Sequence, residues 1–546
     1  MPSLPETTSP PAGLDGIVSY PDDVARRYRD LGYWIGETHW DLLENSASKH
    51  PESIAVRDSR RSLTYRVLRN NALTSAENLS ASGIVRGDRV VVHFPNVVEF
   101  VETTFALFAI GAIPIFALPA HRRSEIRYFI EFATATAYVT VDEAGGYAYG
   151  RLADDLASEF PDLRTVVMPM SEPAPDTQEH RTFRSPTRPR DVAFLQLSGG
   201  TTGRPKLIPR THDDYLYSVR ESNRICGVDA RTVMLVVLPV SHNFTMSSPG
   251  VLGALHAGAT IVLAADTSPD TAFRLIEQHR VTMVSAVPPV ALAWMNSSLR
   301  HSYDLSSLQT IQVGGAKFSE SAARRVANDL GATLQQVFGM AEGLVNYTRL
   351  DDDLDTIART QGRPISPDDE IRVVDDEDND LPMGEPGHLL TRGPYTIRGY
   401  FRAPQHNSTA FTSDGFYRTG DIVTRDARGY LTVVGRAKDQ INRGGEKIAP
   451  EEVENHLLAH ESVHDVSVVG VVDDYLGERS KAYIVLRPEF RSDAPRAAEI
   501  RRFLRERDLA AYKIPDLIEF VSEFPRTSVG KISKNEQRAT PVEANR

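Results

Sequence analysis

The chain has 546 residues, of which 41% are hydrophobic and 25% are charged, and its formal net charge is −12. This length exceeds what one hydrophobic core usually supports, so we expect at least two domains in a soluble globular protein. The negative balance argues against a long surface that follows a nucleic-acid backbone, and we expect no nucleic-acid partner.

The cysteine content and the first residues indicate where the protein works. The single cysteine, Cys226, excludes an intramolecular disulfide and a cysteine-based zinc site, as is typical of the reducing cytoplasm. The start of the chain lacks the basic and apolar regions of a signal peptide. Because no run of about 18 apolar residues occurs, we expect a cytoplasmic protein without a membrane partner. Residues 1–20 are rich in Pro, Ser and Thr and are predicted to be mobile.

From residue 88 onward, short apolar runs alternate with longer amphipathic stretches. Strands separated by helices in this way predict βαβ units, and therefore parallel or mixed sheets with helices on their faces. The proline-rich residues 165–190 are expected to form a surface connection. The apolar runs are residues 89–94, 113–116, 260–263, 281–287, 310–313 and 334–337.

After residue 370 the pattern changes to short strands with Asp/Gly turns, which predicts a small β-rich subdomain. Farther on, Pro450 followed by two acidic residues is a typical helix start. Expected strands near 465–472, 481–487 and 517–522 then flank a helix at 496–508. The predicted fold is therefore α/β: a large domain of mixed βαβ sheets with the β-rich subdomain, residues 21–437, and a small mobile α+β domain, residues 438–546.

Residues Ser198 to Lys206 read Ser-Gly-Gly-Thr-Thr-Gly-Arg-Pro-Lys and follow the apolar run 192–197. Such a loop lets backbone N–H groups converge on an anion, while its hydroxyls and Lys206 add further donors. A solvated turn between strands is the alternative. The order of residues differs from the P-loop, in which lysine follows glycine and precedes Ser or Thr. We therefore expect a phosphate-binding loop that is not that of a P-loop ATPase.

Further short motifs follow this loop in a fixed order. They are His242-Asn243-Phe244, Gly339-Met340-Ala341-Glu342, Tyr417-Arg418-Thr419-Gly420-Asp421, Gly435 to Gln440 with Arg443 to Lys447, and Gly530-Lys531-Ile532. Together they resemble the adenylate-forming (ANL) superfamily, from Leu63 to Lys531. The resemblance implies two half-reactions: a carboxylate and MgATP give an acyl-adenylate and pyrophosphate, and a thiol then takes the acyl group.

The resemblance assigns roles to individual residues. Lys531, Glu342 and His242 are the expected catalytic residues, with Glu342 as the Mg²⁺ ligand. Rotation of the C-terminal domain about the hinge at Lys438 would bring Gly444, Gly445 and Glu446 toward the adenylate for thiolation. The expected ATP-binding residues are Ser198, Gly199, Gly200, Thr201, Thr202, Gly203, Lys206, Ala316, Phe338, Gly339, Met340, Asp421 and Arg436.

The acid pocket resembles that of the stand-alone 2,3-dihydroxybenzoate/salicylate-AMP ligases of siderophore assembly. A neutral Asn243 cannot pair with an α-ammonium group, which favours an acid without an amine there. Ser248 can bond a ring 3-hydroxyl. This favours 2,3-dihydroxybenzoate. Ala341 replaces the usual Thr, and a small residue there resembles the aryl-acid-activating members. Phe244 stands where related enzymes often carry Tyr, so salicylate, 3-hydroxypicolinate and a quinaldate-type acid stay open. The expected substrate-binding residues are Asn243, Phe244, Ser248, Gly315, Val337 and Ala341.

The acceptor thiol must come from another molecule, because the chain has no phosphopantetheine-attachment motif in a carrier-like segment. We expect a separate aryl carrier protein, and free coenzyme A is the alternative acceptor. A non-catalytic adenylate- or carrier-binding protein is a more remote alternative. Arg501, Arg502 and Arg505 lie within one turn of an expected helix and are a candidate dock for the carrier, although an ordinary solvated helix face is as good an explanation.

Overall fold

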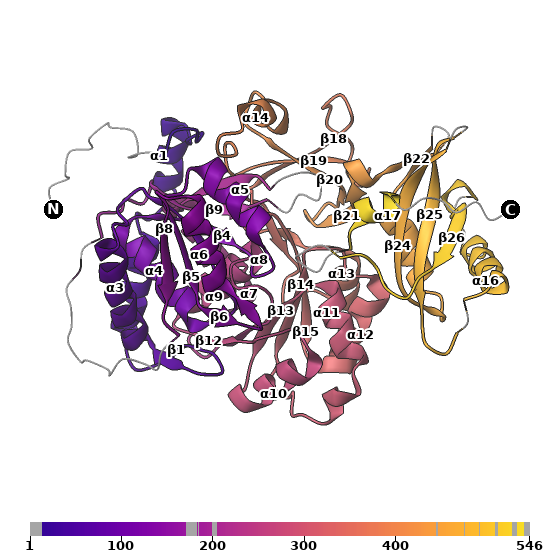
Figure 1. The fold of residues 1–546 in the computed structure, drawn as a ribbon. Helices are drawn as coiled ribbons and strands as arrows, with labels where there is room; N and C mark the ends of the chain where they lie inside the picture. The colour runs from indigo at the N-terminus through magenta and orange to yellow at the C-terminus, as the bar shows by residue number, and fades with distance from the viewer. Residues whose placement is uncertain are drawn as a thin grey trace.

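The structure is a computed structural model that describes residues 14–170, 183, 185–198, 205–443, 446–473, 476–490, 492–507, 511–526 and 532–539. Figure 1 shows a large N-terminal part that carries two sheets with helices around and between them, and a smaller C-terminal part with its own sheet. A small antiparallel sheet lies where these parts meet. The predicted α/β architecture, a large sheet domain followed by a small α+β domain, is confirmed.

The first sheet has the strand order β10–β9–β4–β3–β5–β8. All its pairings are parallel except β9 with β10, which form an antiparallel hairpin. Its strands are β3 (Arg89–His93), β4 (Ile113–Ala117), β5 (Ala137–Val141), β8 (Arg164–Met168), β9 (Val192–Leu197) and β10 (Leu207–Thr211). Because β8 begins at Arg164, the start of the predicted surface connection at 165–190 is instead an edge strand that pairs with β5.

The second sheet has the order β17–β16–β15–β14–β13–β11–β12–β1–β2. The strands from β15 to β1 pair in parallel, and antiparallel strands close both edges. Its strands are β1 (Ile54–Arg57), β2 (Ser62–Thr64), β11 (Val233–Val236), β12 (Thr260–Leu263), β13 (Met283–Ala286), β14 (Thr310–Gly314), β15 (Thr333–Gly339), β16 (Val345–Tyr347) and β17 (Arg363–Pro364).

Helices fill the space between these two sheets and cover their other faces. The helix α4 is apolar over most of its surface, and every residue of it is buried, as expected for a helix enclosed on all sides. In the first sheet, Val90 and Val92 pack toward this central core, whereas Val91 faces the opposite layer of α5 and α6. This alternation follows the two-residue period of a strand.

The helices of the large part are α1 (Asp22–Asp30), α2 (His39–Lys49), α3 (Tyr65–Ala81), α4 (Val98–Ile110), α5 (Arg123–Ala133), α6 (Tyr149–Glu159), α7 (His212–Cys226), α8 (Asn243–Ser247), α9 (Gly250–Ala257), α10 (Pro269–His279), α11 (Pro288–Asn296), η1 (Ser298–His301), α12 (Glu320–Leu330), α13 (Leu354–Arg359) and α14 (Pro404–Ala410). A short hairpin, β6 (Glu143–Ala144) and β7 (Tyr147–Ala148), precedes α6.

The predicted β-rich subdomain is an antiparallel sheet, the third sheet, of β18 (Glu370–Val374), β19 (Gly387–Arg392), β20 (Tyr417–Arg425) and β21 (Leu431–Arg436). The turn η2 (Ala437–Asp439) then leads into the C-terminal part. That part contains β22 (Ile441–Arg443), β23 (Glu446–Ile448), α15 (Pro450–Leu458), β24 (Val463–Asp473), β25 (Gly477–Leu486), α16 (Ala494–Arg505), η3 (Ala511–Lys513), β26 (Leu517–Phe520) and α17 (Lys534–Ala539).

The chain before residue 21 is packed where the structure describes it. Leu14 and Ile17 contact the layer of α5 and α6. The backbone N–H of Arg402 donates to the carbonyl oxygen of Gly16 over 2.8 Å, and the Tyr20 hydroxyl donates to the carbonyl oxygen of Thr396 over 2.8 Å. The packed part of the chain therefore begins before residue 21. Residues 1–13 of the predicted mobile segment lie outside the described residues.

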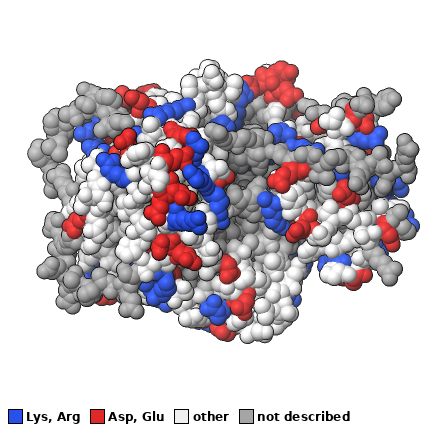
Figure 2. All heavy atoms as spheres, in the orientation of Figure 1, with Lys and Arg blue, Asp and Glu red and all other residues white. Residues whose placement is uncertain are grey.

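The coloured surface in Figure 2 carries charges of both signs next to one another. On that face, acidic and basic side chains form small adjoining groups over the large part and over the C-terminal part. Within the described residues, no helix combines the length and the apolar character needed to cross a bilayer.

Candidate active site

The predicted site residues follow the carboxyl ends of neighbouring strands. Ser198 follows β9, Gly315 and Ala316 follow β14, and Met340 to Glu342 follow β15. The loop after β11 leads to His242, at the start of α8. In open α/β sheets, ligands bind in the crevice outside the carboxyl ends of the strands. The parallel strands therefore bring motifs that are far apart in the sequence to one edge of the large part.

The glycine-rich loop connects the antiparallel strands β9 and β10. The backbone N–H of Ser198 donates to the carbonyl oxygen of Lys206 over 2.9 Å, and the N–H of Lys206 donates to Ser198 Oγ over 3.0 Å. The two ends of the loop are thus tied together by two hydrogen bonds. A strand follows the loop, whereas a helix would follow a P-loop, in agreement with the distinction drawn from the sequence.

Glu342 and Lys206 meet at the ring of Tyr400. The Tyr400 hydroxyl donates to Glu342 Oε1 over 2.7 Å and lies 2.9 Å from the hydroxyl of Tyr417. Lys206 Nζ lies 5.7 Å from the centroid of the Tyr400 ring. The structure therefore brings the end of the predicted phosphate loop close to the predicted metal ligand, through a tyrosine that sequence reasoning did not single out.

The surroundings of Glu342 fit a site completed by a cation and phosphate. Glu342 is buried, and this burial raises the pKa of its carboxyl, while the hydrogen bond from Tyr400 and the charge of Arg436 lower it. Within the described residues, no three His, Cys, Asp or Glu side chains are grouped to hold a metal ion by themselves. Mg²⁺ in nucleotide sites is usually held by one or two carboxylates together with phosphate oxygens. A single buried carboxylate suits that arrangement.

Arg210 fixes the loop that carries Glu342. Its guanidinium donates to the carbonyl oxygen of Ala341 over 2.6 Å and to that of Tyr395 over 2.9 Å. It also forms an ion pair with Asp214 at 2.8 Å, with both side chains almost fully buried. Because Arg210 lies on β10, the strand after the predicted phosphate loop, its contacts link the end of that loop to the segment that carries Glu342.

Asp421 and Arg436 are direct neighbours on β20 and β21. Asp421 Oδ1 lies 2.8 Å from Arg436 Nε, and the two residues are paired across the strands. Asp421 is buried, and Arg436 is partly exposed. The charge of Asp421 raises the pKa of Arg436. These two predicted ATP-binding residues therefore form one unit, with a buried carboxylate held beside a partly exposed guanidinium.

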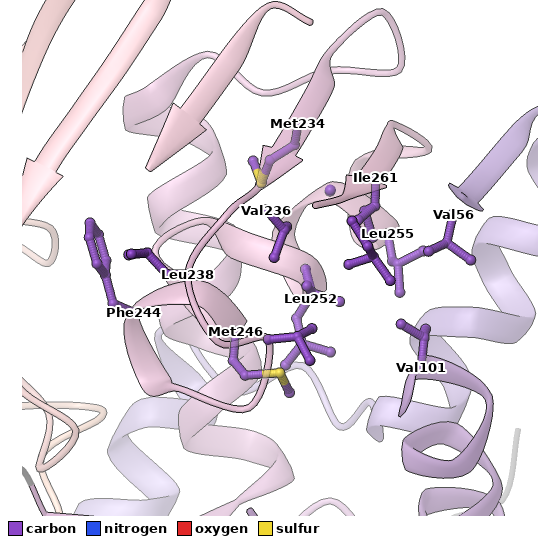
Figure 3. Packing of buried hydrophobic residues seen from close by; sticks show 14 of the residues in the cluster. Val56, Val101, Met234, Val236, Leu238, Phe244, Met246, Leu252, Leu255 and Ile261 are labelled. Atoms are coloured by element: carbon purple, nitrogen blue, oxygen red, sulfur yellow. The ribbon is translucent and has the colours of Figure 1, made fainter. Parts of the chain in front are cut away.

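Phe244 and Val337 form an apolar wall with Gly314. A side chain at Gly314 would meet the Val337 carbonyl oxygen at 2.7 Å and the Phe244 ring at 3.2 Å, so glycine lets the three residues approach one another. In Figure 3, Phe244 lies at the edge of the packed group beside Leu238, whereas Met246 of the same helix lies among the core side chains.

Two of the predicted wall residues, Gly315 and Ala341, do not take part in this contact. The contact with Phe244 and Val337 is made by Gly314, which sequence reasoning did not single out. The predicted Gly315 is the next residue, is exposed, and has a φ of 83°. Ala341 packs in a separate cluster with Ile208, Tyr400 and Tyr417, on the side of the Glu342 carboxylate. Of the predicted wall, the structure thus brings Phe244 and Val337 together at Gly314, and the roles of Gly315 and Ala341 toward the acid stay predictions.

Asn243 and His242 are each held by a specific hydrogen bond. The Tyr215 hydroxyl donates to Asn243 Oδ1 over 2.8 Å. His242 caps α8, because its Nδ1 accepts from the backbone N–H of Phe244 over 3.2 Å. In the neutral imidazole the proton then resides on Nε2, which is the nitrogen that could donate to a ligand.

Ser248 is buried at the end of α8 and contacts the hydroxyl of Tyr347. That tyrosine also donates to Ser222 Oγ over 3.1 Å. Cys226 lies in the same buried polar group and accepts from Gln312 Nε2 at 3.3 Å. Burial raises the pKa of the Cys226 thiol, so this cysteine stays protonated. The Ser248 hydroxyl therefore belongs to an internal hydrogen-bond network.

The predicted hinge lies in the short connection between the third sheet and the C-terminal part. Lys438 is in η2, and its neighbour Asp439 forms an ion pair with Arg538 of α17 at 2.8 Å. Glu446 is the first residue of β23. The other predicted loop and lysine positions, Gly199, Gly200, Thr201, Thr202, Gly203, Gly444, Gly445 and Lys531, lie outside the described residues.

The three arginines of the candidate carrier dock differ in their surroundings. Arg501 donates to the carbonyl oxygens of Pro515 and Asp516, at 3.3 and 3.0 Å, and so holds the chain just before β26. Arg502 and Arg505 are exposed on α16. The part of this group that a partner could reach is therefore Arg502 and Arg505.

Sequence reasoning missed Arg210, Tyr215 and Tyr400. Arg210 carried a signal, since a charge inside the apolar strand Leu207–Thr211 must find a partner when the strand is buried. The two tyrosines carried none, because a buried tyrosine hydroxyl can pair with any nearby polar group. Their partners Asn243 and Glu342 are 28 and 58 residues away in the sequence.

Comparison with known proteins agrees with this arrangement. Residues 43–401 match the AMP-binding enzyme family, and residues 452–531 match the AMP-binding enzyme C-terminal domain. The chain belongs to the AMP-binding enzyme family. The resemblance predicted from the ordered motifs is confirmed.

Several relatives are similar over nearly their whole length. The chain is 54% identical to the 2,3-dihydroxybenzoate-AMP ligase of Bacillus subtilis, over 96% of this chain and 97% of the relative. It is 50% identical to the vibriobactin-specific 2,3-dihydroxybenzoate-AMP ligase of Vibrio cholerae, over 95% and 96%. Among solved structures, the apo structure of MbtA from Mycobacterium smegmatis is 40% identical, with a TM-score of 0.71 and coverage of 96% of this chain and 99% of that one.

Proposed function

We propose that this member of the AMP-binding enzyme family activates an aryl acid of the 2,3-dihydroxybenzoate or salicylate type with MgATP, for siderophore assembly in the cytoplasm. A carboxylate oxygen of the acid attacks the α-phosphorus of ATP, and the bond from this phosphorus to the bridging oxygen breaks to release pyrophosphate. The observation that carries the proposal is that strand β15 bears Val337, which approaches Gly314 and Phe244, and leads directly to Glu342, which meets Tyr400 and Lys206. The names of the relatives support the acid.

Each polar group has a task in this reaction. Ser198, Lys206 and the intervening loop would hold the pyrophosphate side of ATP, and Asp421 with Arg436 would bind the ribose. Glu342 would hold Mg²⁺, which neutralises phosphate charge when bound. Lys531 would stabilise the charge that develops between the carboxylate and the α-phosphate. The Nε2–H of His242 would donate to an oxygen near the carboxylate, because its Nδ1 is already used.

In the second half-reaction, the thiol of a phosphopantetheine arm on an aryl carrier protein attacks the carbonyl carbon of the adenylate. The thiol loses its proton, the thioester forms, and AMP leaves. We propose that the C-terminal part rotates at Lys438, which moves Lys531 away from the adenylate and brings the segment with Gly444, Gly445 and Glu446 toward it. We also propose that Arg502 and Arg505 help to dock the carrier. Free coenzyme A is the alternative acceptor, since a relative 43% identical is named a naphthoate–CoA ligase.

ATP–pyrophosphate exchange tests the first half-reaction over a panel of 2,3-dihydroxybenzoate, salicylate, 3-hydroxypicolinate and quinaldate. We expect exchange that depends on the acid and is abolished by Lys531→Ala. The matched control Lys49→Ala removes an exposed lysine at the end of α2 and should leave the rate unchanged. Exchange with none of the acids would contradict the proposal. If the protein releases a thioester only when free coenzyme A is added, coenzyme A is the acceptor in place of the carrier protein.

A further inference from the structure

The side chain of Tyr215 is held rigidly behind Asn243. Tyr215 lies on α7 and is buried. Phe194 of β9 packs edge-on against its ring, with centroids 4.6 Å apart at 85°, and the Arg210 guanidinium lies 4.7 Å from the ring centroid. The hydroxyl of this fixed ring donates to Asn243 Oδ1 over 2.8 Å. The position of the Asn243 oxygen is therefore set by a side chain that is itself immobilised from two sides.

Hydrogen-bond counting shows which way the Asn243 amide must face. A tyrosine hydroxyl has one proton to donate and lone pairs that accept. The hydroxyl of Tyr215 uses that proton on Asn243 Oδ1, at 2.8 Å. With Oδ1 committed in this way, the group that Asn243 has to offer a ligand is the N–H donor pair of its Nδ2.

We propose that Tyr215 is a positioning residue that fixes the Asn243 amide with Nδ2 toward the acid, and so makes the pocket select acids with a hydrogen-bond acceptor ortho to the carboxylate. This inference rests on the proposed function. In a 2-hydroxybenzoate the hydroxyl donates a hydrogen bond to the neighbouring carboxylate, and the hydroxyl oxygen is left to accept from Nδ2. In a 2-aminobenzoate the amino group would place its N–H donors against the donors of Asn243, which is an unfavourable pairing.

The test compares exchange supported by salicylate with exchange supported by anthranilate, which differ only in the ortho group. For the unmodified protein we expect salicylate to have the higher kcat/KM. In Tyr215→Phe the amide can turn over, and the preference should fall about tenfold, mainly through the KM for salicylate, while the KM for ATP stays the same. The matched control is Tyr217→Phe on the same helix, where the lost buried hydroxyl is paired with Ser366 Oγ at 2.6 Å.

The outcomes separate the inference from the proposed function. No exchange by the unmodified protein with any aryl acid would reject the function itself. The positioning role would be overturned if exchange in Tyr215→Phe fell equally for both acids. It would also be overturned if Tyr217→Phe changed the preference between the acids as much as Tyr215→Phe does. If Tyr215→Phe does not fold, Asn243→Asp carries the test. One oxygen of this carboxylate can still accept from Tyr215, and the other offers an acceptor, so the preference should shift toward anthranilate. An unchanged preference in Asn243→Asp would also overturn the inference.

Discussion

Glu342 and Arg210 are charged side chains that the fold buries, and each depends on named partners. Glu342 accepts a hydrogen bond from Tyr400, and Arg210 is satisfied by Asp214 and two backbone carbonyl oxygens. A buried charge without such partners is costly. Removing the partner of Glu342 should therefore change activity, and breaking the ion pair of Arg210 should lower stability.

The variant Tyr400→Phe should move the acid limb of the pH profile to higher pH. Glu342 must be ionised to bind a cation, so activity falls as the pH drops through its pKa, which burial already raises. The hydrogen bond from Tyr400 lowers this pKa, and its loss raises the pKa further. The measurement is kcat/KM for MgATP between pH 5 and pH 8. Tyr303→Phe is the control, because its hydroxyl donates to Asp270 at 2.7 Å on an exposed surface. An unshifted profile in Tyr400→Phe would contradict the assignment of Glu342.

The variant Arg210→Met should lower the free energy of unfolding by about 3–5 kcal/mol, because it leaves Asp214 as an unpaired buried charge. Denaturant unfolding measures this change. Replacing both residues, as Arg210→Met with Asp214→Leu, should recover part of the loss. The control Arg231→Met breaks an ion pair of an almost fully exposed arginine and should change stability by less than about 1 kcal/mol. Equal effects of Arg210→Met and Arg231→Met would show that burial does not matter here.

The helices α2 and α7 meet at their first residues, His39 and His212. Both helices begin with a capping box, from Thr38 to Asp41 and from Thr211 to Asp214. His212 Nδ1 accepts from the backbone N–H of His39 over 3.0 Å and lies 2.7 Å from the Nδ1 of His39. Burial lowers the pKa of both imidazoles, that of His212 to about 3. Two helix starts are therefore joined through neutral histidines.

Acid should weaken this junction. The unfolded chain takes up protons on these histidines below about pH 6.5, whereas the folded chain does not, so stability is present above pH 6.5 and falls below it. Each histidine contributes about 1.4 kcal/mol per pH unit. The slope of the unfolding free energy against pH gives the number of protons taken up on unfolding. Between pH 6 and pH 5, His39→Met should lower this number by about one. His301→Met, at an exposed site, is the control. An unchanged slope in His39→Met would contradict the prediction.

At the level of elements, the sequence predicted the strands well and their partners poorly. The apolar runs at 89–94, 113–116 and 310–313 correspond to β3, β4 and β14, because continuous apolar runs are typical of strands buried on both faces. The antiparallel pairing of β9 with β10 was not predicted. The parts of the site that depend on long-range contacts, such as Ala341 O with Arg210, carry no local pattern.

The sequence indicated candidate site residues where chemistry requires one residue type, and gave no signal where several types would serve. Glu342, Asp421 and Arg436 stand in motifs, and the structure pairs Glu342 with Tyr400 and Asp421 with Arg436; their roles toward a nucleotide stay predictions. Gly314 was not singled out, since two adjacent glycines give no sign in the sequence of which one touches Phe244, and the role of Gly315 toward the acid stays a prediction. Packing in three dimensions makes that choice.

In the whole molecule, the C-terminal part meets the large part through α15, which packs against β21. Glu451 in the first turn of α15 is largely buried there, and its Oε2 has no hydrogen-bond partner among the described residues. Burial, and then the charge of Glu454, raise the pKa of Glu451 to about 7, while Lys534 and Lys317 lower it. Lys317 belongs to the large part, so charges from both parts face each other across this contact.

The arrangement of the two parts should therefore respond to pH. If rotation exposes Glu451, its pKa returns toward its ordinary value near 4.5, so the arrangement described here binds an extra proton between pH 4.5 and pH 7. Lowering the pH from 8 to 6 should favour this arrangement, and Glu451→Gln should abolish the response. Fluorophores on Lys49→Cys and Arg502→Cys can report the distance, because Cys226 is buried. Glu506→Gln, at an exposed position, is the control, and a pH response that persists in Glu451→Gln would contradict the prediction.

The two faces of strand β15 bear on how the preference for the acid could change in evolution. Val337 packs toward Gly314 and Phe244, whereas the next residue, Phe338, packs toward the third sheet with Leu389 and Val423. Successive side chains of a strand point to opposite faces. In the proposed function, the face of Val337 meets the acid, and the face of Phe338 packs against the sheet that carries Asp421 and Arg436, which are proposed to bind the nucleotide. A substitution at Val337 can therefore change the acid while the nucleotide side stays intact, so one strand lets substrate choice diverge in evolution without loss of the shared chemistry.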